Sequence, residues 1–188
     1  MNIPKPTPTG KQIKLDTRKY IVSKTDDKGI ITYGNDYFTK ISGYKESELI
    51  GSPHNILRHP DMPKAIFHLM WKYLKNGKNI MAVVKNLSKN GDYYWVVTDF
   101  NIKRDFSGDI RYFLAFRQAA PKQVVTDIEP LYAKLLEIEK THDMDASIAY
   151  FEGYLEERKM SYDQFIEDLA KPKGLAGVFF SKMKKIFT

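Results

Sequence analysis

The residues best suited to chemistry gather in one short stretch, residues 54–64, which reads HNILRHPDMPK. It holds two histidines, an arginine and an aspartate around two prolines. Proline fixes its own φ angle and restrains the residue before it, so these polar groups lie on a stiffened turn. Imidazole, guanidinium and carboxylate groups held in fixed positions suit the binding of a polar or charged ligand.

An enzymatic centre is not expected. No histidine, serine and carboxylate are spaced to suggest nucleophilic catalysis, and potential metal ligands are too few for a metal site. The chain has no cysteine. This excludes disulfides, thiolate metal sites, covalent c-type haem and cysteinyl–flavin photochemistry. We therefore expect a binding protein in a reducing cytosol.

The charge pattern argues against nucleic-acid binding. The net charge is +7, but residues 120–170 sum to −7 and residues 171–188 to +5. A nucleic-acid-binding domain concentrates basic residues on its main body, whereas here the densest basic segment is the end of the chain. No apolar run approaches the roughly 20 residues that cross a bilayer, and the polar start lacks the apolar core of a signal peptide.

The elements that position the polar stretch can be read from the pattern of residues. Residues 1–18 have spaced prolines and no apolar period, which predicts a flexible arm. YIVSKT and IITYG predict two short strands around Asp27-Lys28-Gly29. A long helix opens at Pro63, with Asp61 expected as its N-cap, and closes at Asn76-Gly77.

Three longer strands follow the helix. NIMAVVKNLSK ends at Asn90-Gly91, DYYWVVTDFNIKR ends at Ser107-Gly108, and DIRYFLAFRQA completes the set. Asn-Gly is a strong two-residue hairpin signal. This order predicts an α+β domain over residues 19–120, with a five-stranded antiparallel sheet and helices on one face.

Helices are expected after the sheet. Residues 121–171 are acidic and predict a helical extension, with capping boxes at Thr126–Glu129 and Ser161–Gln164. Residues 172–188 form a basic amphipathic tail. Its pattern fits a helix at a membrane surface, a helix in a partner's groove, or a last helix packed on its own domain. Flanking helices also make a homodimer plausible.

Two segments of the sequence resemble one protein family. YGNDYFTKISGYKESELIGSPHNILRHPDMPKAIFHLMWKYLKNGK, followed by VVKNLSKNGDYYWV, resembles the PAS sensor domain of bacterial aerotaxis receptors. The resemblance covers residues 20–119 and implies the PAS fold with FAD held non-covalently between the sheet and the helices. It also implies a set of cofactor-binding positions, which are Arg58, His59, Asp61, Trp71 and, more weakly, Asn35 and Asn86.

Several of these residues suit a flavin chemically. An asparagine amide such as that of Asn86 can pair with the pyrimidine edge of the ring, and Trp71 can form an aromatic wall. Arg58, just ahead of the long helix, suits the FAD pyrophosphate. Each also has a structural alternative: Asp61 as an N-cap, His59 as a bond within the turn, Arg58 as a surface ion pair, and Trp71 as core.

Two departures from the family pattern leave alternatives open. Ile80 stands where the family has tryptophan, and Leu87 stands where it has arginine after VKN. A PAS domain that has lost its ligand and serves as an adaptor is therefore the alternative function. A haem gas sensor with His68 or His59 as the iron ligand is a weaker one.

The expected function is a cytosolic sensor of redox or energy state in chemotaxis. The chain shows no kinase, cyclase or coiled-coil output segment. It is expected to relay the redox state of FAD to a separate membrane-bound transducer. The basic tail, residues 172–188, would hold it near the inner face of the membrane or on its partner.

Overall fold

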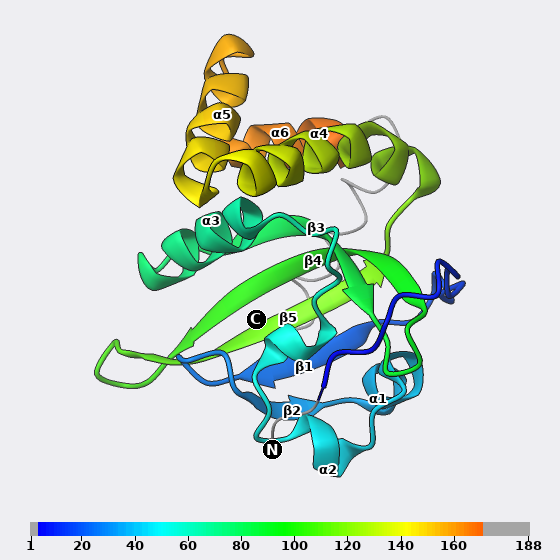
Figure 1. Ribbon diagram of the computed structural model, residues 1–188. Coiled ribbons are helices and arrows are strands. Elements are labelled where there is room, and N and C mark those ends of the chain that lie inside the picture. The colour runs from blue at the N-terminus through cyan, green and yellow to red at the C-terminus, as the bar shows by residue number, and fades with distance from the viewer. Residues whose placement is uncertain (1–3, 171–188) are drawn as a thin grey trace. The chain divides into compact units, whose positions relative to one another are not determined.

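A five-stranded antiparallel sheet forms the centre of the first part of the chain (Figure 1). The computed structural model describes residues 4–170. The spatial order of the strands is β2-β1-β5-β4-β3, and every neighbouring pair is antiparallel. Their bounds are β1 Ile21–Thr25, β2 Ile31–Gly34, β3 Ile80–Leu87, β4 Tyr93–Arg104 and β5 Ile110–Ala119. The predicted α+β sheet is confirmed.

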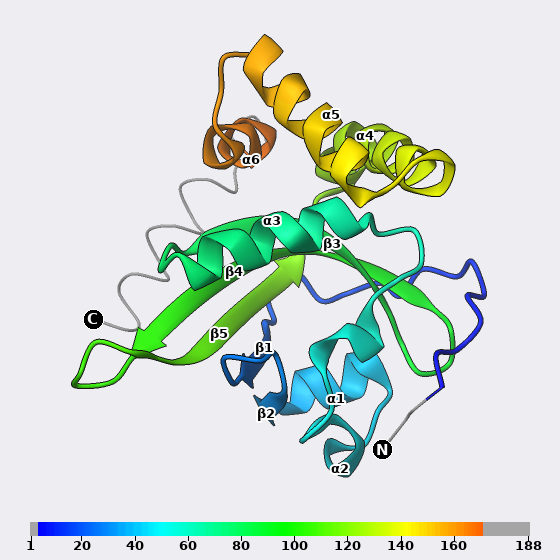
Figure 2. The same ribbon diagram turned by 60° about the vertical axis from the view of Figure 1, so that its left-hand side comes forward.

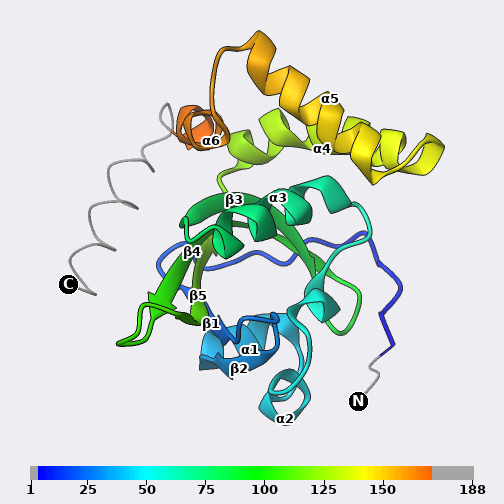
Figure 3. The ribbon, with the colours of Figure 1, turned by 90° about the vertical axis from the view of Figure 1, so that its left-hand side faces the viewer.

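The helices between β2 and β3 lie along one side of the curved sheet (Figure 3). They are α1 (Asp36–Ser42), α2 (Glu46–Leu49), the 3-10 helix η1 (His54–Leu57) and α3 (Lys64–Lys75). The polar stretch of the sequence therefore begins in η1 and ends at the start of α3. The stretch adjoins the edge of the sheet, where the Arg58 backbone bridges to Asn86 of β3.

The long helix α3 begins two residues later than an Asp61 cap would place it. Its N-cap is Pro63, which makes no side-chain capping bond. The prediction of Asp61 as N-cap is therefore wrong, because its carboxylate pairs instead with Lys85. The apolar face of α3 buries Ala65, Ile66, Met70 and Leu74.

The hairpin between β3 and β4 forms where Asn90-Gly91 predicts it. Gly91 has φ +89°, a left-handed conformation that favours glycine, and its N–H donates to the Ser88 carbonyl at 2.9 Å. The N-terminal segment pairs with this hairpin. Thr9 N–H donates to Gly91 O at 2.8 Å, and Ile13 N–H donates to Tyr93 O at 2.7 Å. Within the stretch expected to be a flexible arm, residues 9–13 are thus hydrogen-bonded.

The chain divides between Ala120 and Pro121 into two compact units. In the second unit α4 (Lys122–Thr141) packs against α5 (Met144–Glu157), and α6 (Tyr162–Ala170) follows (Figure 2). The predicted basic tail, residues 172–188, lies outside the described residues. Within residues 4–170, no helix is long and apolar enough to cross a membrane.

The two predicted capping boxes have different outcomes. Ser161 and Gln164 form theirs, since Ser161 N–H donates to Gln164 Oε1 at 2.7 Å and Gln164 N–H donates to Ser161 Oγ at 3.3 Å. Thr126 caps nothing. It lies inside α4, which begins at Lys122, and its hydroxyl donates to the Lys122 carbonyl at 3.0 Å.

Candidate functional site

One face of the sheet carries a row of buried polar side chains. Side chains alternate between the two faces of a strand. The pairing of Arg117 with Thr98 and Ile21, and of Asn86 with Tyr94, therefore sets these residues on a common face. We call it the inner face because Trp71 of α3 contacts it at Phe113. Its buried polar members are Ser23, Thr25, Asn86, Tyr94, Thr98 and Arg117.

Arg117 lies on β5, the central strand of the sheet, and is only 3% exposed. Its Nη1 donates to Ser23 Oγ at 2.9 Å, and its Nη2 approaches His54 Nε2 at 2.9 Å. The guanidinium also lies 5.8 Å from the ring centre of Phe100. Among residues 4–170 no ion pair joins Arg117 to a carboxylate.

His54 must be neutral in this arrangement. A guanidinium can only donate hydrogen bonds, so His54 Nε2 accepts and the ring proton is on Nδ1. Loss of hydration, and next the charge of Arg117, lower the pKa of His54 to about 3. The residue as a whole is partly exposed, but Nε2 faces the buried guanidinium. Burial lowers the pKa of Arg117 to about 10, so it stays charged at neutral pH.

Two hydroxyls of the inner face have no partner within the described part of the chain. Tyr94 OH and Thr98 Oγ1 are fully buried and make no hydrogen bond there. Burial raises the pKa of the Tyr94 phenol above its ordinary value. A buried polar group without a partner costs roughly 1–3 kcal/mol. A ligand that offers hydrogen-bonding atoms to this face would remove that cost.

The predicted residues His59 and Asp61 lie together, but not on the inner face. Asp61 Oδ2 accepts from Lys85 Nζ at 2.7 Å, and His59 Nδ1 accepts from the Asp61 N–H at 3.1 Å. Lys85 precedes Asn86 on β3 and therefore points to the opposite face. Its ammonium also lies 4.6 Å from the ring centre of Tyr93. Burial and then Lys85 lower the pKa of His59.

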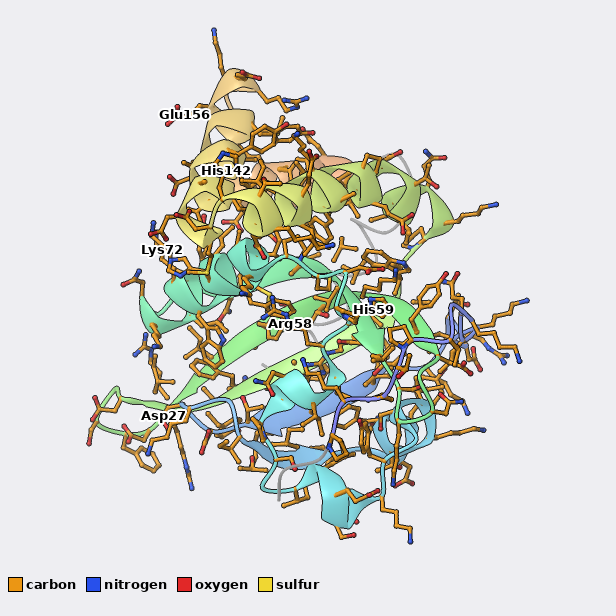
Figure 4. The ribbon with its side chains drawn as sticks, viewed as in Figure 1. Asp27, Arg58, His59, Lys72, His142 and Glu156 are labelled. Carbon is orange, nitrogen blue, oxygen red and sulfur yellow. The ribbon has the colours of Figure 1, made fainter. Side chains whose placement is uncertain are left out.

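Arg58 lies beside the inner face through its backbone, which bridges to Asn86 on the edge strand β3. Its Nη2 donates to the Met62 carbonyl at 3.1 Å, and its guanidinium lies 4.2 Å from the Phe67 ring centre. Figure 4 shows Arg58 and His59 on the segment that leads into α3. Arg58 therefore lies between the end of η1 and the start of α3.

Trp71 and Asn86 are the predicted residues that reach the inner face itself. The Trp71 ring meets Phe113 edge to face, with the ring centres 5.6 Å apart. Asn86 is 4% exposed and is the cross-strand neighbour of Tyr94. The two come from opposite walls, since one is on α3 and the other on β3.

Asn35 has a structural position. It is the N-cap of α1, where its Oδ1 accepts from Phe38 N–H at 3.0 Å. The same amide accepts from Val22 N–H at 3.1 Å and donates to the Tyr20 carbonyl at 2.9 Å. Asn35 thus ties α1 to β1, and these bonds already use its carbonyl oxygen twice.

Metal and haem sites find no support. No cluster of three histidine, cysteine, aspartate or glutamate side chains that could hold a metal ion is found among the described residues. His68, the alternative haem ligand, is exposed on α3, and His59 pairs with the backbone of its own turn.

Sequence reasoning missed Arg117 and its partners Ser23 and His54. The signal was present in the strand RYFLAFRQA, where Arg117 follows Phe113 and Ala115 at intervals of two and so shares their buried face. The contact with His54 could not be read in this way, because it joins residues 63 positions apart.

The chain resembles known proteins in sequence and in fold. Residues 31–117 match the family described as PAS fold. The aerotaxis receptor of Escherichia coli strain K12 is 44% identical over 115 residues, which cover 61% of this chain and 22% of the receptor. A nitrogen fixation regulatory protein of Klebsiella pneumoniae is 26% identical over 97 residues, covering 52% of this chain and 20% of that protein.

Solved structures share the fold. The dark structure of the blue-light photoreceptor Aureochrome1 LOV matches with a TM-score of 0.52 and 19% identity, over 64% of this chain and 84% of that one. A light-oxygen-voltage domain studied with a flavin analogue matches with a TM-score of 0.51 and 22% identity, over 64% and 87%. Residues 31–117 therefore match the PAS fold family, and the domain that contains them is similar in sequence to part of the aerotaxis receptor.

Proposed function

We propose that this PAS domain binds FAD non-covalently against its inner face and reports a redox or energy state in an aerotaxis-type signalling pathway. The observation that carries the proposal is the row of buried polar groups on the inner face, the face that Trp71 contacts at Phe113. Arg117 is a buried cation without a carboxylate partner, and Tyr94 OH and Thr98 Oγ1 have unmet hydrogen bonds among the described residues. The similarity to the aerotaxis receptor suggests the pathway, and flavin as the ligand follows from the family resemblance of the sequence.

The residues present fit a flavin. The isoalloxazine ring has a polar edge, for which the Asn86 amide and the hydroxyls of Tyr94 and Thr98 supply partners, and a flat surface that Trp71 can cover. Arg58, ahead of α3, would hold the pyrophosphate. When bound, the flavin would supply reversible uptake of electrons. His59 and Asp61 would support the site indirectly, by fixing the turn that carries Arg58.

The two departures from the family pattern bear on this fit unequally. Ile80 is cross-strand neighbour to Phe100 on the inner face and is 2% exposed, so it replaces a large wall with a smaller one. Leu87 is 1% exposed but faces away, because it follows Asn86 on the same strand. Only Ile80 therefore bears directly on the ligand, and the smaller wall is expected to weaken binding by about 1 kcal/mol.

The signalling role rests on a partner. A PAS sensor of this type would pass the state of its ligand to another protein, and we propose a separate membrane-bound chemotaxis transducer. The described residues that would respond are those that link the inner face to its surroundings, notably Arg58 through its bridge to Asn86. A cytosolic location, a homodimer and membrane contact through residues 172–188 stay predictions.

The absorption spectrum of the freshly purified full chain tests the proposal. A two-banded flavin spectrum that bleaches with dithionite, with FAD released on denaturation, is the expected result. The test variant is W71A, which removes the aromatic wall and should lower the flavin content. Circular dichroism is the control, and it should show unchanged secondary structure. A blank spectrum that persists after FAD is added would overturn flavin binding and favour a ligand-free adaptor.

A further inference from the structure

Arg117 carries a charge that the fold does not neutralise. It is 3% exposed on the central strand, and its polar contacts are two neutral groups, Ser23 Oγ and His54 Nε2. An ion in a low-dielectric interior is costly unless an opposite charge or several hydrogen bonds compensate it. The other buried cation of the domain, Lys85, has such a partner in Asp61. Arg117 is thus a buried charge on the inner face that has no counter-charge among residues 4–170.

The guanidinium is nevertheless held in a fixed position. Ser23 lies on β1, His54 on η1 and Arg117 on β5, so three separate elements converge on it. These contacts use two of the five N–H donors of the guanidinium, one on Nη1 and one on Nη2. Its cross-strand neighbour is Thr98, whose hydroxyl has no partner among residues 4–170. The remaining donors therefore lie where the inner face has unmet hydrogen-bonding groups.

We propose that Arg117 faces the reducible ring of the bound flavin and stabilises the negative charge that the ring gains on reduction, with Ser23 and His54 as positioning residues. This inference rests on the proposed function and goes further, because it names the residue that sets the reduction potential. Arg117 itself exchanges no electron and no proton. It acts by attraction, which is strong where water is excluded.

The direction of the effect follows from the sign of the charge. A cation beside the ring favours the reduced, more negative form over the oxidised form, and so raises the midpoint potential. A neutral His54 is essential to this arrangement, since a protonated ring would repel the guanidinium and could not accept its hydrogen bond. Arg58 and Lys85 cannot take this role in the same way, because Arg58 lies over Phe67 outside the sheet and Lys85 points to the opposite face.

The test is a spectroelectrochemical titration of the flavin-loaded full chain. R117Q keeps a hydrogen-bond donor and removes the charge, and R117K keeps the charge. R111Q is the matched control, because Arg111 is on the same strand but exposed. We expect the midpoint potential of R117Q to fall, that of R117K to stay nearer the wild type, and that of R111Q to be unchanged.

Two further variants test the positioning residues. H54Q and S23A leave the arginine in place but loosen it, and each should lower the potential by less than R117Q does. In the double variant R117Q/H54Q the effects should not add, because His54 acts through Arg117. If circular dichroism shows that R117Q does not fold, the single variants H54Q and S23A test the proposal instead.

The outcomes separate the two proposals. R117Q that binds flavin with an unchanged midpoint potential would overturn the role of Arg117 and leave flavin binding intact. An equal fall of the midpoint potential in R111Q would also overturn the role of Arg117. If R117Q does not fold, unchanged midpoint potentials in both H54Q and S23A would overturn it. A wild type that takes up no flavin would overturn both proposals.

Discussion

Arg117 donates a hydrogen bond from Nη2 to His54 Nε2 at 2.9 Å, and this bond joins the last strand of the PAS domain to the 3-10 helix η1. The two side chains would repel each other if both were charged. The bond therefore selects one protonation state of each, a neutral imidazole and a charged guanidinium. Because the polar stretch begins at His54, the bond also fixes where the stretch enters the space over the sheet.

Acid should weaken the domain through His54. Its pKa falls from an ordinary 6.5 to about 3 in the folded protein, because of lost hydration and the charge of Arg117. Between these values the unfolded chain binds more protons than the folded one. The stability that neutral His54 contributes is thus complete above pH 6.5 and is lost as the pH falls toward 3, by at most about 1.4 kcal/mol per pH unit.

Urea unfolding at a series of pH values measures this slope. H54Q should unfold with a shallower dependence on pH across the window, since glutamine does not titrate. The control is H68Q, which makes the same substitution at an exposed position on α3. Identical slopes for wild type and H54Q would show that His54 does not carry the acid sensitivity.

The ion pair of Asp61 and Lys85 predicts an asymmetric response to substitution. Lys85 is 9% exposed in its side chain and Asp61 is 57% exposed, so the two partners differ in their access to water. D61N removes the negative charge that compensates the buried ammonium of Lys85 and should cost about 1 kcal/mol or more. K85M leaves a carboxylate that water can reach, and should cost less than D61N.

Chemical denaturation of D61N and K85M at low and high salt checks this order. High salt should reduce the difference in unfolding free energy between the wild type and D61N, because screening weakens the Asp61–Lys85 ion pair, which only the wild type has. E48Q is the comparison nearer the surface, where Glu48 pairs with Lys89 at 2.6 Å and the two side chains are 26% and 44% exposed. K85M less stable than D61N would contradict the argument from burial.

The sequence was a good guide wherever the signal is local. Alternation and the Asn90-Gly91 dipeptide predicted the strands and their hairpin, and the spacing of apolar residues predicted α3. The sites of Asp61 and Arg117 were harder, because their partners are distant in the chain. Asp61 reads as an N-cap from its position before Pro63, but Lys85, 24 residues away, offers its carboxylate a stronger partner.

Asn35 should act on stability more than on ligand binding. Its amide caps α1 at Phe38 and also accepts from Val22 N–H, so two backbone donors depend on it. N35A should lower the free energy of unfolding by about 2 kcal/mol. N35D keeps the capping oxygen but loses the donor to the Tyr20 carbonyl, so it should recover only part of this loss. Thermal unfolding of the two variants decides, and equal losses would mean that the capping oxygen is unimportant.

The pairing of the N-terminal segment with the β3–β4 hairpin can be tested at Gly91. A Cβ at this position would meet the carbonyl of Thr7, and its φ of +89° is unfavourable for any other residue. Gly108 has nearly the same φ, +87°, in the other long hairpin, but a Cβ there meets nothing within 4 Å. G108A therefore carries only the backbone cost, whereas G91A carries that cost and the displacement of Thr7.

We expect G91A to lower the midpoint of thermal unfolding by more than G108A does. Hydrogen exchange should also speed up at the amides of Thr9 and Ile13 in G91A but not in G108A, because both donate to the hairpin. If the two variants lost equal stability and exchange at residues 9–13 were unchanged, the segment would contribute nothing to the domain. Faster exchange there in G91A would instead make residues 9–13 part of the folded PAS unit, held by the turn that Asn90-Gly91 forms.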